Sequence, residues 1–229
     1  MTTGQIMQQY FVKIKSITQI NPDVFQIVTE KPGMFRFIPG QATEVSINKE
    51  GWENTTKPFS FTCLPENPYL EFTIKTYPVH QGVTNQVLKL KKGDELIIHD
   101  VYGAIRYCGE GTFIAGGAGI TPFISIFRYL HSKNDVGNNI LLFANKKKTD
   151  IILEEEFKSI LGNNFINVLS DEKAEGYASG FVTEKLIRKK NAGLHKLFYV
   201  CGPPPMVESM NNQLARMGIS KNSIVKEAL

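Results

Sequence analysis

Three short segments of the chain combine residue types that can bind a ligand or take part in chemistry. The first is the run 115–122, Ala-Gly-Gly-Ala-Gly-Ile-Thr-Pro, between an apolar stretch and a helical pattern. Glycines there let the backbone approach a pyrophosphate closely, and the following helix offers free N–H groups and a positive dipole end. Pro122 stands where the last glycine of GxGxxG would be, so the segment also fits a tight strand-to-helix turn in any α/β protein.

The second segment is Cys201-Gly202-Pro203-Pro204-Pro205-Met206, which follows the apolar run 197–200. A helix that opens at the carboxyl end of a parallel strand lies where open α/β sheets bind ligands. Cys201 could touch a planar ring there, although a small buried core residue is an equally ordinary role for a cysteine. Met206, Met210 and Met217 fit the core face of the same helix.

The third segment is Lys57-Pro58-Phe59-Ser60. An aromatic ring beside a hydroxyl and a cation could stack on a flat ligand, donate a hydrogen bond to it and pair with a phosphate. The alternative is that Phe59 and Phe61 only form the inward face of a strand.

The elements that carry these segments change in kind near residue 108. Before it, short β-rich runs alternate with turn residues, and one short helix is expected at 84–90. The strands are expected at 10–17, 24–28, 42–47, 59–63, 69–75 and 95–99. Many short, evenly spaced strands predict an antiparallel β-barrel, here in a domain of residues 1–108.

Residues 109–229 alternate strand and helix, which predicts an α/β domain with a doubly wound parallel sheet. Thr121 and Pro122 are expected as N-cap and first-turn proline of the first helix. The strands are expected at 112–115, 140–143, 165–169 and 197–200, and the later helices at 153–161, 183–189 and 204–217.

Composition restricts the class of protein. A formal net charge of +4 is too mild for a typical nucleic-acid binder. Three separated cysteines exclude a disulfide framework, a thiolate metal site and an iron–sulfur cluster of the chain's own. Thr112–Phe127 is too short to span a bilayer, and the first ten residues lack a signal-peptide pattern. We therefore expect a cytoplasmic protein with no metal and no membrane insertion.

Taken together and in order, the segments resemble the ferredoxin–NADP reductase family of flavoproteins. The family pattern is Arg-x-Tyr/Phe-Ser/Thr, Gly-Val-Ser-Asn, Gly-x-Tyr-Gly, Gly-Gly-x-Gly-Ile-x-Pro and Cys-Gly-Pro-Pro-Pro-Met. Its counterparts here are Lys57–Ser60, Gly82–Asn85, Asp100–Gly103, Gly116–Pro122 and Cys201–Met206. The resemblance covers the chain from Phe35 to its end.

The resemblance implies a role for each motif. Phe59 would stack on the flavin of FAD, Ser60 would hydrogen-bond near its N5, and Lys57, beside Pro58, would hold the pyrophosphate. Ser60 and Cys201 would be the catalytic residues. The other implied FAD contacts are Ile74, Lys75, Thr76, Gly82, Val83 and Thr84. The implied contacts of the nicotinamide dinucleotide are Gly117, Gly119, Thr121, Ser170, Asp171, Cys201, Gly202, Pro203 and Met206.

The chain departs from the family pattern at three positions. Lys57 replaces an arginine and loses its two-pronged contact with phosphate, which predicts weaker FAD binding. Ala42 stands where relatives often have an aromatic. Many relatives also end near an aromatic that shields the flavin, whereas this chain ends in Leu229, which predicts an open site.

The choice between NADH and NADPH is predicted from the residues after the run 165–169. NADPH-preferring relatives tend to carry serine and arginine there, whereas this chain has Ser170-Asp171-Glu172. Carboxylates repel a 2′-phosphate and accept hydrogen bonds from ribose hydroxyls, which favours NADH. Lys146, Lys147 and Lys148 could offset this preference, although a solvated loop is their more ordinary role.

The expected activity is hydride transfer from NAD(P)H to FAD and release of electrons to a ferredoxin, flavodoxin or oxygenase component. Two alternatives stay open. The protein could be a flavin reductase that uses free FMN or FAD as substrate, or a non-catalytic nucleotide-binding subunit of an oxidoreductase complex.

Overall fold

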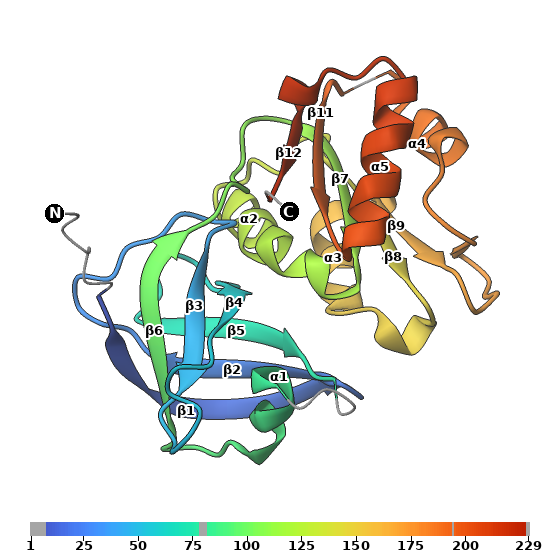
Figure 1. The fold of residues 1–229 in the computed structure, drawn as a ribbon. Helices are drawn as coiled ribbons and strands as arrows, with labels where there is room; N and C mark the ends of the chain where they lie inside the picture. Colours follow the sequence, from blue (N-terminus) through green and yellow to red (C-terminus); the bar gives the residue numbers. More distant parts are fainter. Residues whose placement is uncertain (1–7, 78–81, 194, 228–229) are drawn as a thin grey trace, which may run out of the picture.

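The computed structural model describes residues 8–77, 82–193 and 195–227, which form two lobes. Figure 1 shows the first lobe below the second, with helix α2 (Thr121–Ser132) between them. The first lobe is a six-stranded sheet in the order β4-β3-β6-β1-β2-β5, and every neighbouring pair is antiparallel. Its strands are β1 (Tyr10–Asn21), β2 (Val24–Glu30), β3 (Ala42–Ile47), β4 (Lys57–Ser60), β5 (Tyr69–Lys75) and β6 (Glu95–Tyr102).

A bridge between Phe61 and Phe72 links the chain after β4 to β5, so the two ends of the sheet meet. The apolar residues of alternating strand positions fill the interior, including Val12 and Ile14 of β1. Closure leaves the sheet without an open edge, which is a common solution in antiparallel β proteins. The predicted antiparallel barrel is confirmed.

The second lobe is a six-stranded parallel sheet in the order β10-β9-β8-β7-β11-β12. Its strands are β7 (Gly111–Gly116), β8 (Ile140–Asn145), β9 (Phe165–Leu169), β10 (Ala178–Ser179), β11 (Leu197–Cys201) and β12 (Ile224–Lys226). Helices α2 and α3 (Glu154–Leu161) cover one face, and α4 (Glu184–Asn191) and α5 (Pro204–Arg216) cover the other. The predicted doubly wound sheet is confirmed.

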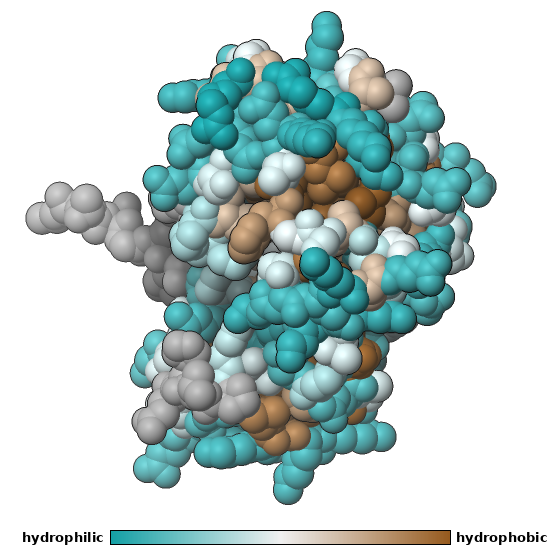
Figure 2. Space-filling view, turned by 90° about the vertical axis from the view of Figure 1, so that its right-hand side faces the viewer, coloured by the Kyte–Doolittle hydropathy of each residue, from teal (hydrophilic) through white to brown (hydrophobic). Residues whose placement is uncertain are grey.

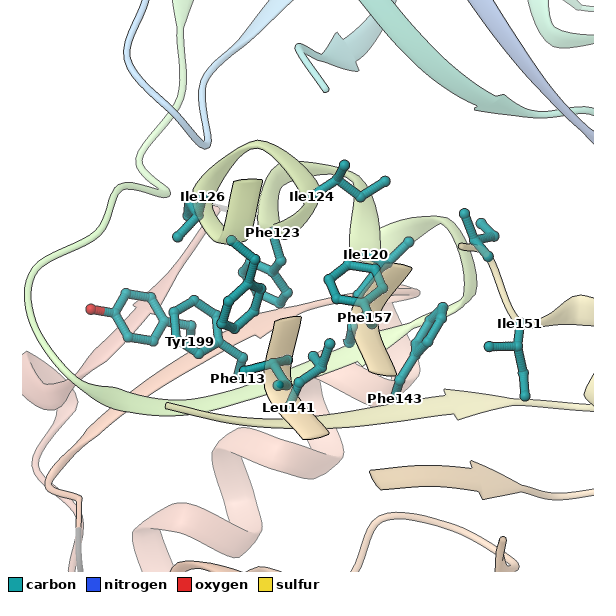
Figure 3. Packing of buried hydrophobic residues seen from close by; sticks show 14 of the residues in the cluster. Phe113, Ile120, Phe123, Ile124, Ile126, Leu141, Phe143, Ile151, Phe157 and Tyr199 are labelled. Atoms are coloured by element: carbon teal, nitrogen blue, oxygen red, sulfur yellow. The ribbon is translucent and has the colours of Figure 1, made fainter. Parts of the chain in front are cut away.

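The core under α2 is aromatic (Figure 3). Phe113 of β7 stacks on Tyr199 of β11 with ring centroids 4.0 Å apart, and Phe123 of α2 meets Phe113 edge to face. Val24 from the barrel belongs to the same buried cluster, so the lobes share apolar contacts. Such packing holds α2 rigidly on the sheet that supports the glycine turn.

Some local expectations were wrong. Thr121 is not an N-cap, because the turn η2 (Gly117–Ile120) runs directly into α2 and gives Thr121 helical dihedrals. The helix expected at 84–90 divides into α1 (Val83–Gln86) and the 3₁₀ turn η1 (Val87–Lys89). β1 extends to Asn21 and β6 to Tyr102, and strands β10 and β12 were not expected. The domain boundary after residue 108 stays a prediction.

The remaining helical pieces are single 3₁₀ turns, η3 (Lys148–Asp150), η4 (Gly162–Asn164) and η5 (Lys221–Ser223). Hydrophilic residues cover most of the surface seen in Figure 2, and apolar residues gather in separate patches on the two lobes. Within the described residues, no helix is long and apolar enough to cross a membrane.

Candidate functional site

Two turns at the carboxyl edge of the parallel sheet touch each other without space for a side chain between them. β7 and β11 are neighbours and place Ala115 beside Cys201. A Cβ on Gly119 would lie 2.5 Å from the Cys201 carbonyl carbon and 2.6 Å from the Gly202 Cα. The glycine at 119 is therefore required by the close approach of the two predicted nucleotide turns.

The opposite side of the first turn is open. Gly117 has φ of +50°, a conformation that favours glycine, and a Cβ there would meet nothing within 4 Å. Thr121, half-buried, begins α2, and its N–H donates to the Ala118 carbonyl of the preceding 3₁₀ turn. The N–H groups that lack partners within this continuous helical run are therefore those at its start, in the glycine turn itself. A half-buried backbone turn beside open space, at the positive end of a 12-residue helix, fits the charge and size of a pyrophosphate.

Cys201 ends β11 and is half-buried beside the glycine turn. Burial, with a smaller effect from the charge of Glu227, raises the pKa of Cys201 to about 12, so its thiol is neutral at physiological pH. Gly202 is half-buried and Pro203 exposed, so both can line a pocket. Met206 packs against Gly116 and the buried cluster of α5, which makes it part of the support of the turn.

Glu227 was not expected in this region. Its carboxylate accepts hydrogen bonds from the N–H of Ala104 at 3.2 Å and of Ile105 at 3.4 Å, and so ties the end of the chain to the segment that joins β6 to β7. No sequence pattern connects a glutamate with backbone groups more than 120 residues away, so only the structure could place it.

The predicted flavin motif forms β4 and continues into the bridge at Phe61. Lys57 and Pro58 are exposed, Phe59 and Ser60 are half-buried, and Phe61 is fully buried. Phe59 therefore keeps an accessible surface that Phe61 lacks, as a ring-stacking residue requires. Among the described residues Lys57 has no ion-pair partner, so its ammonium is available to a phosphate.

The side chains at the end of β5 are less available to a ligand than those of β4. The Ile74 side chain is 2% exposed within the barrel core, so only its backbone could face a ligand. Lys75 pairs with Asp23 at 3.0 Å, and the Thr76 hydroxyl donates to the Asp23 carbonyl at 3.0 Å. These two side chains hold the turn before β2 in this structure.

The predicted phosphate loop begins at Gly82, where a Cβ would meet nothing within 4 Å. Val83 belongs to the barrel core, and Thr84 is half-buried. Val83 can therefore contribute only its backbone N–H, which is the contribution that the motif predicts.

The predicted ribose end lies after β9. The Ser170 hydroxyl donates to Asp171 at 2.5 Å, and the Asp171 N–H donates to the Lys146 carbonyl at 3.0 Å. Glu172 accepts from the Lys148 N–H at 2.8 Å, and the Lys148 ammonium lies 5.5 Å from the ring centroid of Tyr177. Asp171 is thus an exposed carboxylate directly after β9, while Lys148 and Glu172 contact other groups.

Helix α2 brings the two halves of the site together. The glycine turn leads directly into its first residue, and the helix contacts β4, which carries Phe59 and Ser60. The residues present fit a flavin on the barrel and a dinucleotide on the glycine turns, with open backbone at both phosphate loops and an accessible aromatic at the ring position. Leu229 lies outside the described residues, and the individual residue roles stay predictions. Within those residues, no group of three or more His, Cys, Asp or Glu side chains could hold a metal ion.

Comparisons with known proteins agree with this geometry. Residues 113–212 match the family model of the oxidoreductase NAD-binding domain. NADH-cytochrome b5 reductase 1 of Pyricularia oryzae is 27% identical over 238 residues, which cover 93% of this chain and 75% of that protein.

Solved structures show the same fold. A ferredoxin NADP+ reductase from Neisseria gonorrhoeae with bound FAD and NADP superposes with a TM-score of 0.83 at 17% identity, covering 96% of this chain and 98% of the other. The cytochrome b5 reductase domain of Ulva prolifera nitrate reductase gives 0.81 at 21% identity, covering 96% and 97%.

Residues 113–212 belong to the oxidoreductase NAD-binding domain family, and the chain as a whole resembles the ferredoxin–NADP reductase-like flavoproteins. The resemblance of the motifs is thereby confirmed, and with it the enzyme class, an NAD(P)H-dependent flavoprotein reductase. The predicted cofactor pair of FAD and a nicotinamide dinucleotide is that of the family, and electron transfer is its activity.

Proposed function

We propose that this reductase takes electrons from NADH onto FAD and passes them to a one-electron acceptor protein. The observation that carries the proposal is the contact between the two glycine turns at Gly119 and Cys201. The helix that follows Gly119, α2, also contacts β4, the strand of Phe59 and Ser60. Two binding surfaces meet there at one edge of the parallel sheet.

The chain's own residues position the reactants. Phe59 offers a ring surface to the flavin, and the Ser60 hydroxyl stands next to it as a hydrogen-bond donor. The backbone around Gly117 receives the dinucleotide pyrophosphate, and the neutral Cys201 thiol presents an uncharged surface to the nicotinamide. Bound flavin supplies the redox chemistry, since it accepts a hydride and releases electrons singly. The protein's contribution is proximity and orientation.

NADH is the proposed reductant because Asp171 is an exposed carboxylate where a 2′-phosphate would lie. Removing that charge with Asp171→Ser should raise kcat/KM for NADPH roughly fivefold, since one unit charge a few ångströms away contributes about 1 kcal/mol in water. Activity with NADH should change less. Steady-state kinetics with both nucleotides measure the ratio, and an unchanged ratio would show that Asp171 does not face the ribose.

The sequence predicted a ferredoxin, flavodoxin or oxygenase component as the acceptor. We now propose a b5-type haem protein, since the relatives are named NADH-cytochrome b5 reductases. The formal charge of +4 would favour encounter with an acidic partner. We also propose a cytoplasmic location, on the cysteine usage alone.

The test is anaerobic purification followed by gel filtration and titration with NADH. Yellow colour that elutes with the protein and bleaches with NADH, followed by reduction of an added b5-type haem protein, supports the proposal. A colourless protein that reduces added FMN or FAD saturably would instead favour the free-flavin reductase, for which the exposed Lys57 is the supporting feature. Bound flavin that NADH does not reduce would indicate the non-catalytic subunit.

A further inference from the structure

Arg128 of α2 makes a network of hydrogen bonds between the two lobes. Its guanidinium donates to the Thr62 carbonyl at 2.7 Å and to Glu71 at 2.6 Å, both in the barrel. On the other side it donates to both carboxylate oxygens of Glu156 in α3, at 2.5 and 2.8 Å. Only a planar, multi-pronged donor can satisfy these groups together.

The barrel side of this network is buried and internally bonded. Glu71 is 7% exposed and also accepts from the Thr62 hydroxyl at 2.8 Å, which in turn accepts from Thr73 at 3.2 Å. Burial lowers the pKa of Arg128, but the hydrogen bond to Glu156 and the charge of Glu71 outweigh it and raise the pKa. We call the network of Arg128 with Thr62, Glu71 and Glu156 the joint between the lobes. Its guanidinium is permanently charged, and its hydrogen bonds fix its geometry.

A second anchor lies on the same face of α2. Ser125, three residues before Arg128 and fully buried, accepts a hydrogen bond from the Gly40 N–H at 3.0 Å. Gly40 leads into β3, and the Phe61 N–H donates to the carbonyl of Gln41 at 3.0 Å. The helix thus holds two adjacent backbone segments of the barrel, both just beyond the Ser60 end of the flavin motif.

This arrangement makes α2 a spacer between the two predicted cofactor sites. Thr62 is two residues beyond Ser60, and Arg128 is about 10 Å along the helix axis from Thr121 at the glycine turn. A shift of the barrel on α2 would change the separation between Ser60 and the turn by the same amount.

We propose that Arg128, with Ser125, is a positioning residue that sets the distance and tilt between the flavin and the nicotinamide. The inference rests on the proposed function, and it gives a contact between the lobes, away from the reacting atoms, a role in the rate of hydride transfer. Neither residue is among the predicted cofactor contacts, so their replacement should alter the geometry of hydride transfer and leave both binding surfaces in place.

The test compares Arg128→Lys and Ser125→Ala with matched controls that do not join the lobes. Arg188→Lys changes an exposed pair within α4, and Ser132→Ala removes a hydroxyl that bonds only to its own helix. Lysine keeps the charge beside Glu71 but cannot reach all of the oxygens that Arg128 contacts. The Arg128 variant therefore avoids an uncompensated buried carboxylate.

Three readouts are expected to move together in the two joint variants. The rate of flavin reduction per bound flavin at saturating NADH should fall about tenfold or more, since ångström shifts cost up to about 10²-fold, while the Kd for NADH stays within about threefold. The charge-transfer absorbance of reduced protein with NAD+ should weaken. Amide exchange at Gly40 should accelerate in flavin-free protein.

An Arg128→Lys protein with normal rate per flavin and normal charge-transfer absorbance would overturn the inference, even if its Tm fell. A purely structural joint would give that result. If wild-type protein is not reduced by NADH, the proposed function fails, whereas amide exchange at Gly40 in the flavin-free variants still tests the joint by itself.

Discussion

The contact between the two nucleotide turns gives a sharp prediction for Gly119→Ala. The new Cβ would lie 2.5 Å from the Cys201 carbonyl carbon, about 1 Å short of the 3.4 Å at which ordinary contact begins. The neighbouring atoms are backbone and cannot rotate away, so the turns must separate. We expect a loss of about 1–3 kcal/mol of stability from overpacking. A misplacement of about 1 Å should also slow flavin reduction at saturating NADH by up to about 10²-fold.

Two other glycines provide controls. Gly33→Ala introduces a Cβ into open space at a position with an ordinary φ. It should change neither the stability nor the rate of flavin reduction. Gly117→Ala also meets no neighbour, but it has φ of +50° and points to where the pyrophosphate would lie, so it should weaken NADH binding more than the saturated rate. The measurements are denaturant unfolding of the flavin-free protein and stopped-flow reduction of the loaded protein. A Gly119→Ala variant as stable and as fast as Gly33→Ala would refute the reasoning.

Three further predictions concern the barrel and pH. Lys57→Arg restores a two-pronged phosphate contact and should lower the Kd for FAD roughly five- to tenfold, measured by flavin fluorescence; unchanged affinity would place Lys57 away from the phosphate. Phe61→Ala should cost about 3–5 kcal/mol of unfolding free energy because the ring is fully buried. Phe59→Ala should cost much less but should release the flavin, because that ring is only half-buried. Denaturant unfolding and gel filtration measure the two effects, and equal stability losses would contradict the stacking role. Burial raises the pKa of Cys63 to about 11 and of Cys201 to about 12, above the ordinary 9.0, so the folded state holds protons that the unfolded state releases. Stability should therefore fall as pH rises from about 9 toward 12, and constant stability over that range in pH-dependent unfolding would argue against buried thiols.

The fold followed closely from the sequence because its signals are local. Alternating strands with turn residues between them predicted the barrel, and the change near residue 108 to strand–helix alternation predicted the parallel sheet. The N-cap role expected for Thr121 was wrong because a 3₁₀ turn through Gly117–Ile120 leads directly into the helix, and that turn depends on packing against β11. The two-residue strand β10 is too short to leave a periodic pattern.

The candidate site was predictable only where motifs are contiguous. The pattern of Phe59 and Phe61 did not indicate which ring stays accessible, since that depends on the closure of the barrel at Phe72. Lys75 of β5 forms an ion pair with Asp23 in the turn before β2, which no spacing rule reveals. Arg128 gains its role from contacts across the two lobes, and Glu227 from contacts with the segment that joins β6 to β7. Neither set of contacts can be read from a single sequence.

The most direct test of the central claim is single-turnover reduction of the bound flavin by NADH carrying deuterium at C4 of the nicotinamide. If the glycine turns and the Phe59–Ser60 strand hold the two rings face to face, deuterium at one of the two C4 positions will slow the bleaching at saturating nucleotide, and deuterium at the other will not. Bleaching that is insensitive to both labels at saturation, or bound flavin that NADH leaves oxidised, would contradict the account.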